Sequence, residues 1–377
     1  MVSAWGECLP SQPPNTTTSS PPNRPDSLPM KLTIALSIVA AATGVAAQTA
    51  PPTLHVFGDA LSSLGAVSQL VPGITLPSVP VWSDFLAPLL GAQLANTGIG
   101  SALPLNPLGI VSSQDQINFF QAIRPLLAQA ASHSGDFAVL ETGANAVIAQ
   151  LLSAAPSATT PEAFATALAT ATVKQLEQLR KLGFRNFIVP SLMDIQSTPL
   201  AQQLVAAAAS TPAGRQLMAA AATLPVAQYN QALSQQVAAW TRSATGLGTV
   251  ALVPVGEFVN TILQSPPVWQ ALGLTDVQAA CIAGNGANFV LSSNVAASVQ
   301  QLVTGALTGT LCDSPSTHFF LDGIHFGERV QRLLAFFVQR LVDAARSGQT
   351  FEPTAANLLT LISALNLASP AAALAQA

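Results

Sequence analysis

A small set of residues has the types and spacing needed to attack an ester carbonyl, and one of them lacks its reactive atom. Asp322 and His325 are three residues apart, close enough on one turn for the carboxylate to orient the imidazole. A histidine held in this way can remove the proton of a serine hydroxyl, which then becomes the nucleophile. Near the other end of the chain an apolar run leads into Gly58-Asp59, where a nucleophilic serine is expected next. The residue there is Ala60.

The elements that must position these residues alternate between two kinds. Short runs rich in β-branched and aromatic residues predict strands at 53–57, 137–141, 186–190 and 250–255. Longer amphipathic segments predict helices at 82–91, 114–132, 161–182, 201–221, 225–245 and 326–346. Strands separated by helices of this length indicate parallel crossovers and a sheet covered on both faces. The sequence therefore predicts an α/β fold.

Several of the predicted strands end in residues that suit a site. The first runs into 58–60, the second into 142–145 and the third into 191–193. A further segment, "LANTGIGSAL" at 94–103, has two glycines in a predicted loop where the backbone could approach a ligand closely. Because sites in open parallel sheets form at the carboxyl ends of the strands, we expect these segments to meet there.

Four short blocks, in order, resemble the GDSL family of lipases and acylhydrolases, a branch of the SGNH hydrolases. The first block of that family appears as Gly58-Asp59-Ala60-Leu61-Ser62, and the second matches 96–102. The third block matches 143–146 and the last, Asp-x-x-His, matches 322–325. Each block alone is weak evidence, but four in register over residues 55–340 are strong evidence together.

The resemblance implies a three-layer α/β/α sandwich with a mostly parallel, flavodoxin-like sheet. It also implies roles for individual residues. Asp322 and His325 would be catalytic, beside a nucleophile position occupied by Ala60. The oxyanion would be bound by the backbone N–H of Ala60, the backbone N–H of Gly100 (Gly98 if the register slips) and the side-chain amide of Asn145.

Asp59 and Gly143 would support the site, Asp59 by orienting its loop or capping the next helix.

There are two departures from the family pattern. Ala146 stands where the family usually has a supporting Asp, and Ala60 stands at the nucleophile itself. Ser62 and Ser63 lie nearby but beyond the turn, so their side chains are expected to point elsewhere. Deleting the nucleophile of a serine protease costs on the order of a million-fold in kcat. We therefore expect ordinary ester turnover to be lost.

The N-terminal region predicts secretion. Residues 1–29 are rich in Pro, Ser, Thr and Asn without apolar periodicity, which indicates a disordered or wrongly assigned upstream segment. Residues 30–47 combine Met30-Lys31, a short apolar run and small residues near Ala47, the pattern of a secretory signal peptide. An uncleaved anchor is the alternative. We expect the hydrolase-like domain at 48–350 and an apolar C-terminal tail at 351–377, for which a packed helix with a frayed end or a lipid anchor are the two interpretations.

Secretion makes the cysteines informative. Cys8 lies in the upstream segment, which leaves Cys281 and Cys312 as a pair in an oxidising compartment. We predict a disulfide between them, and two buried thiols are the alternative.

Composition excludes several classes of partner. Charged residues make up only 8% of the chain and no basic cluster occurs, which argues against nucleic acid. His55, His133 and His318 show no metal-ligand spacing and no glycine loop follows the first strand, so neither a metal nor a nucleotide cofactor is predicted. No membrane-spanning segment is expected once the signal is removed, and we expect a monomer.

Three functional hypotheses remain. The first is a secreted GDSL-type protein that has lost its nucleophile and binds acylated carbohydrate or lipid esters without cleaving them. The second is an active ester hydrolase that uses another nucleophile or a water activated by His325, or in which Ala60 is an engineered or erroneous residue. The third is a non-catalytic structural secreted protein.

Overall fold

The computed structural model describes residues 51–62, 80–97, 112–126, 133–144, 146–147, 160–202, 212–283 and 310–367. All of these belong to the compact unit formed by residues 44–377. The predicted signal peptide and upstream segment, and the predicted oxyanion residues Gly100 and Asn145, lie outside the described residues.

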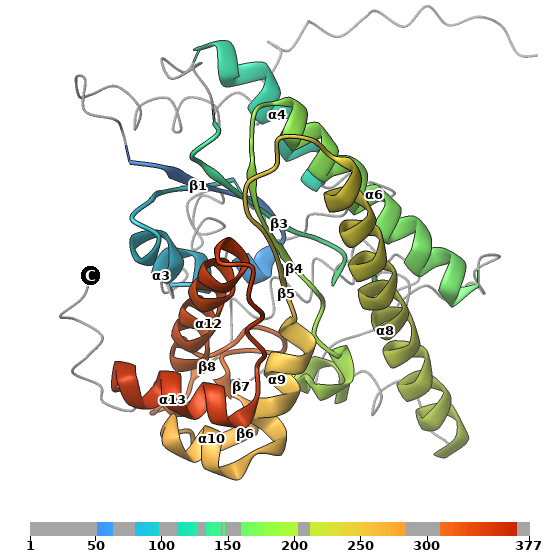
Figure 1. Ribbon diagram of the computed structural model, residues 1–377. Helices are drawn as coiled ribbons and strands as arrows, with labels where there is room; N and C mark the ends of the chain where they lie inside the picture. The colour runs from blue at the N-terminus through green and yellow to red at the C-terminus, as the bar shows by residue number, and fades with distance from the viewer. Residues whose placement is uncertain are drawn as a thin grey trace, which may run out of the picture. The chain divides into compact units, whose positions relative to one another are not determined.

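A five-stranded parallel sheet forms the centre of this unit (Figure 1). Its strands lie in the order β2-β1-β3-β4-β5, and their bounds are β1 Thr53–Gly58, β2 Gln93–Asn96, β3 Phe137–Glu141, β4 Asn186–Pro190 and β5 Val250–Val253. The four predicted strands are confirmed, although β5 ends two residues before the expected position. The edge strand β2 was not predicted, because a four-residue run with two polar residues carries almost no strand signal by itself.

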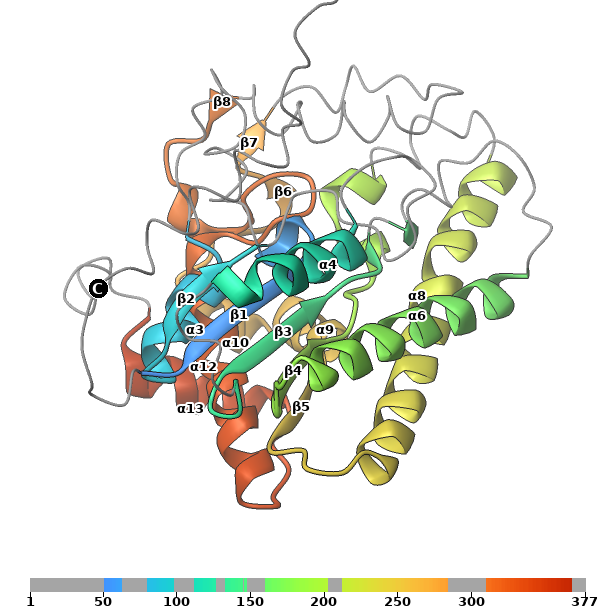
Figure 2. The ribbon, with the colours of Figure 1, turned by 90° about the horizontal axis from the view of Figure 1, so that it is seen from above.

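Alternation along the strands supplies two apolar faces. In β3, Phe137 and Val139 point into one core, and Ala138 and Leu140 point into the other. The first core is closed by helices α3 (Trp82–Leu89), α9 (Val255–Gln264), α10 (Pro266–Ala271), α12 (Glu328–Arg346) and α13 (Ala355–Leu365). The second is closed by α4 (Ser113–Ile123), α6 (Pro161–Lys181) and α8 (Pro212–Ser243), as Figure 2 shows from above. The predicted α/β fold with helices on both faces of a parallel sheet is therefore confirmed.

Helix α8 corrects the prediction of two helices at 201–221 and 225–245. It runs without interruption from Pro212 to Ser243, with Pro225 inside it. A proline removes one backbone hydrogen bond, a local cost that packing can outweigh. From residue 226 onward a stripe at helical spacing is buried against the second core, formed by Val226, Tyr229, Leu233, Val237 and Trp240.

Residues beyond 350 join the first core. Thr354 caps the start of α13 by accepting a hydrogen bond from the backbone N–H of Asn357 at 3.3 Å. Leu358, Leu361 and Ile362 are buried beside α12. None of the helices in the described part of the chain is both long and apolar enough to span a membrane.

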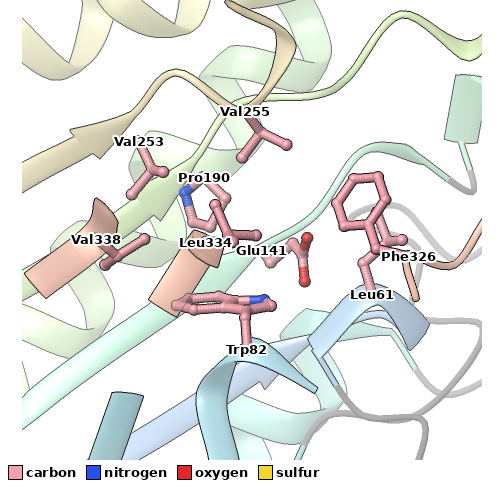
Figure 3. A pocket seen from close by; sticks show the side chains of 9 residues that line it. All are labelled: Leu61, Trp82, Glu141, Pro190, Val253, Val255, Phe326, Leu334 and Val338. Carbon is pink, nitrogen blue, oxygen red and sulfur yellow. The ribbon is translucent and has the colours of Figure 1, made fainter. Parts of the chain in front are cut away.

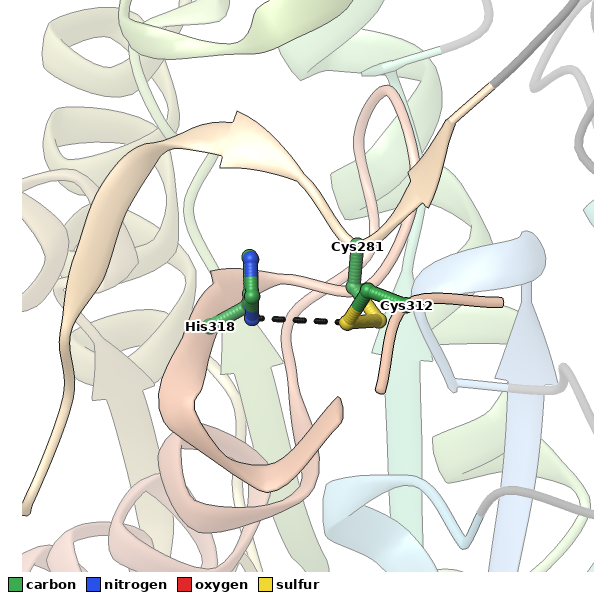
Figure 4. A group of neighbouring side chains, drawn as sticks. All are labelled: Cys281, Cys312 and His318. Atoms are coloured by element: carbon green, nitrogen blue, oxygen red, sulfur yellow. Dashed lines mark hydrogen bonds between the residues drawn. A yellow bond between two sulfur atoms is a disulfide. The ribbon is translucent and has the colours of Figure 1, made fainter. Parts of the chain in front are cut away.

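The predicted disulfide between Cys281 and Cys312 is confirmed. Cys281 lies between β6 (Asp276–Ala280) and β7 (Ile282–Ala283), and Cys312 directly follows β8 (Thr310–Leu311) (Figure 4). The backbone N–H groups of Cys281 and Ile282 donate to the carbonyl oxygens of Phe320 and Leu321, at 3.0 and 2.7 Å. The bridged segment therefore holds the backbone just before Asp322.

Replacing both cysteines should destabilise the fold. The bridge closes a loop with a sequence separation of 31 residues. We expect Cys281→Ala/Cys312→Ala to lower the free energy of unfolding by about 3–4 kcal/mol, measured by urea denaturation. A phosphine reductant should weaken the wild-type protein by a similar amount and leave the double variant unchanged. Equal stability of the two proteins under oxidising conditions would contradict the prediction.

Candidate active site

The turn after β1 is held by a side-chain amide from the neighbouring helix. The Oε1 atom of Gln116 accepts from the backbone N–H of Gly58 at 2.8 Å, and its Nε2 donates to the Gly58 carbonyl at 2.9 Å. A Cβ atom at Gly58 would clash with the carbonyl oxygen of Glu141 on β3. Only glycine lets β1 and β3 approach this closely, which fixes the place at which the next two residues leave the sheet.

Asp59 starts the short helix η1 (Ala60–Ser62) that carries the nucleophile position. Its Oδ1 accepts from the backbone N–H of Leu61 at 3.2 Å, and its carbonyl accepts from that of Ser62 at 3.3 Å. The side chain is buried, with 1% of its surface exposed. Burial raises the pKa of Asp59 to about 7, while the Leu61 N–H and the charge of His325 act in the opposite direction. These contacts fit the loop-orienting role predicted for Asp59.

Ser62 is fully buried and already bonded. Its hydroxyl donates to Oε2 of Glu141 and accepts from the indole Nε1–H of Trp82 at 3.1 Å. Its carbonyl accepts from the Asn96 side chain at 2.6 Å. A hydroxyl fixed between an indole and a carboxyl group inside the core cannot reach a substrate without breaking both bonds. Ser63 lies outside the described residues.

Glu141 is a site-adjacent residue that sequence reasoning missed. It ends β3 and is 4% exposed. Its carboxyl group projects among Trp82, Leu334 and Phe326 into a small, largely apolar cavity between the sheet and helices α3 and α12 (Figure 3). Burial, and then the nearby Asp59 carboxyl group, raise its pKa well above the ordinary value. An acidic residue at the end of an otherwise apolar strand was the available signal.

Asp322 and His325 form the expected pair in the loop between β9 (His318–Phe320) and α12. The Nδ1–H of His325 donates to Oδ2 of Asp322 at 2.6 Å. The other oxygen, Oδ1, accepts the backbone N–H groups of Ile324 and His325 at 2.9 and 2.8 Å. Burial alone would raise the pKa of Asp322, but the charge and ring hydrogen bond of His325, with the two N–H bonds, outweigh it and lower the pKa.

The second ring nitrogen of His325 is available for chemistry. Its Nε2 atom is buried and has no hydrogen-bond partner among the described residues. With Nδ1–H held by Asp322, Nε2 carries the lone pair and can take a proton from a hydroxyl group or a water. The charge of His325 lowers the pKa of Asp59, so this loop lies near the turn that bears Ala60, some 260 residues earlier in the chain.

Gly143, the other predicted supporting residue, begins the loop after β3. It has a φ of +120°, and a Cβ there would lie 3.2 Å from Cζ of Tyr229. The Tyr229 hydroxyl donates to the carbonyl of Thr142 at 2.9 Å, so α8 clamps this loop. The loop leads to Asn145, whose predicted oxyanion role is not tested by the described residues.

A family model described as GDSL-like Lipase/Acylhydrolase matches residues 54–336. No curated protein matches.

Similar solved structures include three bacterial proteins of low identity. One is a candidate GDSL-like lipase from Parabacteroides merdae, with 10% identity over 79% of this chain and 98% of that one (TM-score 0.38). Another belongs to the lipolytic G-D-S-L family of Veillonella parvula, with 14% identity over 67% and 98% (TM-score 0.32). A catalytic mutant of an acetylxylan esterase from Geobacillus stearothermophilus has 13% identity over 57% and 81% (TM-score 0.31).

The two buried carboxyl groups should make stability depend on pH. Asp59 and Glu141 have raised pKa values in the folded state. The folded protein therefore holds more protons than the unfolded chain from about pH 4 upward, to about pH 7 for Asp59 and beyond its ordinary range for Glu141. Their contribution to the free energy of unfolding is complete below that pH range and is lost as the pH rises through it. We expect the free energy of unfolding to fall from pH 5 to 9, by up to about 1.4 kcal/mol per pH unit for each proton.

Glu141→Gln should flatten this dependence, because the amide keeps an acceptor for the Ser62 hydroxyl and does not ionise. Urea unfolding at each pH, followed by tryptophan fluorescence, measures it. Glu352→Gln, which changes an exposed carboxylate, is the matched control and should keep the wild-type slope. If Glu141→Gln leaves the slope of unfolding free energy against pH unchanged, the raised pKa of Glu141 is not a cause of the pH dependence.

Proposed function

Because the chain belongs to the family of GDSL-like lipases and acylhydrolases, we propose that it binds acylated carbohydrate or lipid esters in an esterase-type site that has lost its nucleophilic hydroxyl. The observation that carries the proposal is the Asp322–His325 pair. It presents a buried, unpartnered Nε2 in a loop coupled to the turn that bears Ala60. A base poised in this way has its use where a hydroxyl or water must give up a proton.

The remaining parts of the site follow the family pattern. The backbone N–H groups of Ala60 and Gly100 and the amide of Asn145 would bind the carbonyl oxygen of the ester. Ala60 can still supply its N–H, because this donor does not depend on the side chain. The Gln116 clamp on Gly58 and the Asp59 contact to Leu61 support a fixed position for that N–H.

Loss of the hydroxyl removes the covalent step. In subtilisin, removing the nucleophile costs about 2 × 10⁶ in kcat, and about 10³–10⁴-fold over water survives through the oxyanion donors and binding. Ser62 is a poor replacement, because its hydroxyl is bonded to Glu141 and Trp82 inside the core. A water activated by His325 could support slow hydrolysis without a covalent intermediate.

We also propose that the protein is secreted, after removal of residues 30–47, and acts as a monomer. The Cys281–Cys312 disulfide supports an oxidising compartment, because such bridges persist mainly outside the cytosol.

Restoring the hydroxyl tests the proposal. We expect Ala60→Ser to raise kcat/KM on short-chain p-nitrophenyl esters and acetylated xylan by at least about 10³-fold, a part of the loss seen when such a nucleophile is removed. Ala60→Gly is the matched control, because it changes the same side chain without adding a hydroxyl, and it should stay at the background rate. Adding His325→Ala to Ala60→Ser should return the rate to background.

The protein with Ala60 supplies the second half of the test. It should bind acetylated xylo-oligosaccharides in a calorimetric titration while its turnover stays far below the 1–10³ s⁻¹ typical of enzymes. Turnover by this protein within that range would overturn the proposed impairment. Absence of both binding and restored turnover would favour the structural alternative.

A further inference from the structure

Two histidines and an aspartate converge at the opposite end of the sheet from the candidate active site. His55 is the third residue of β1, and Asp136 directly precedes β3, so both lie near the amino ends of their strands. His133 begins the turn that leads into β3, and its carbonyl accepts the backbone N–H of Asp136 at 3.1 Å. One potential ligand atom from each of the three side chains lies within 4.8 Å of the other two.

The spacing of the histidines along the chain predicted no metal site, but the fold groups two of them with a carboxylate. We propose that His55, His133 and Asp136 bind a divalent transition-metal ion of the Zn²⁺ class, at a site that ties the start of β1 to the turn before β3. The proposal does not depend on the function proposed above, because none of these residues belongs to the ester site.

The distances suit such an ion. Nδ1 of His133 and Nε2 of His55 lie 2.7 and 3.6 Å from the same atom, Oδ2 of Asp136. In a tetrahedral zinc site with metal–ligand bonds of about 2.0–2.2 Å, neighbouring ligand atoms lie roughly 3.3–3.5 Å apart. Both observed distances can reach this value through small side-chain rotations. A water can supply the fourth ligand, because the side chain of Asp136 is 18% exposed.

The other oxygen of Asp136 is already fixed. Oδ1 accepts the backbone N–H of Thr53 at 2.8 Å, which orients the carboxylate and leaves Oδ2 for the two histidines. Partners of this kind, which hold a ligand in place without touching the ion, are a regular part of metal sites.

The surroundings of His55 and Asp136 favour an uncharged imidazole and an ionised carboxylate. Burial lowers the pKa of His55 in spite of the nearby Asp136, which keeps its imidazole neutral at neutral pH. Burial alone would raise the pKa of Asp136, but the hydrogen bonds from His133 and from the Thr53 N–H, together with the nearby His55 ring, outweigh it and keep the group ionised. Neutral imidazole and ionised carboxylate are the forms that bind metal ions.

His133 can give up its hydrogen bond to Asp136 and remain uncharged. In the present arrangement Nδ1–H donates to Asp136, while Nε2 is buried without a hydrogen-bond partner among the described residues. Binding moves the proton from Nδ1 to Nε2, so the ring stays neutral and the ion takes the proton's place between Nδ1 and Oδ2. No described donor occupies Nε2 and opposes that shift.

The surroundings are apolar on several sides. His133 stacks on Phe184 with ring centroids 4.9 Å apart, and Phe120 lies 5.1 Å from His55 and 5.4 Å from His133. A low-dielectric wall strengthens the attraction between the carboxylate and a divalent cation. The second group of ligand-type side chains, Cys281, Cys312 and His318, differs in kind. Its sulfur atoms are joined in the disulfide (Figure 4) and are not thiolate ligands.

The test is calorimetric titration of the full chain, free of any histidine tag and stripped with EDTA, with ZnCl₂. We expect one Zn²⁺ per chain and a rise in Tm. Asp136→Asn and His55→Gln should each weaken binding by at least about 10–100-fold, the loss that follows even from removing a partner that only orients a ligand. His318→Gln, the matched histidine substitution outside the group, should leave it unchanged. Mg²⁺ and Ca²⁺ should not bind, because they prefer oxygen ligands.

Failure of the full chain to bind Zn²⁺ would overturn the proposal, as would binding that His318→Gln abolishes and the other variants retain. If Asp136→Asn and His55→Gln do not fold, the absorption spectrum of Co²⁺ bound to the wild-type protein tests the site. An intense tetrahedral spectrum without a thiolate charge-transfer band supports the site. A thiolate band, which would indicate the third cysteine, Cys8, refutes it, as does a weak octahedral spectrum.

Discussion

The hydrogen bond between Asp322 and His325 is the interaction on which the candidate site depends. It has chemical use only if Nε2 of the same ring is presented beside the turn that follows β1. Those two segments are more than 260 residues apart, and three features of the fold bring them together. The parallel sheet ends β1 and β3 at one edge, the strand pairing β6–β9 leads the chain to Asp322, and the Cys281–Cys312 bridge holds the backbone immediately before it.

The turn after β1 also explains why two acidic groups are buried there. Asp59 supplies the acceptor that starts η1, and Glu141 receives the Ser62 hydroxyl that ends it. Burial raises both pKa values, and the nearby Asp59 carboxyl group raises that of Glu141 further, so the fold favours their protonated forms. The turn that bears Ala60 is therefore held by groups whose contribution to stability falls as the pH rises.

The sequence predicted the fold class better than it predicted the bounds of the individual helices and strands. Central strands such as 137–141 are buried on both faces, so their composition alone identifies them. The edge strand β2 was missed because its pairing with β1, not its composition, makes it a strand. The sequence predicted two helices at 201–221 and 225–245, whereas one helix, α8, continues through Pro225 and packs against the second core. Tertiary contacts decide such cases, and local patterns do not contain them.

What the sequence determined by itself was chemical identity: Ala60 has no hydroxyl, Asp322 and His325 are spaced for one turn, and the chain has three cysteines. Only the tertiary structure decided which distant groups meet. It brought the Glu141 carboxyl group to Ser62, whose hydroxyl donates a hydrogen bond to it. It also brought His55 to within 3.6 Å of an Asp136 oxygen across 81 residues of chain. The physical reason is that spacing along the chain constrains contacts only within a turn or a strand pair. Side chains on neighbouring parallel strands meet through a register that the packed sheet alone sets.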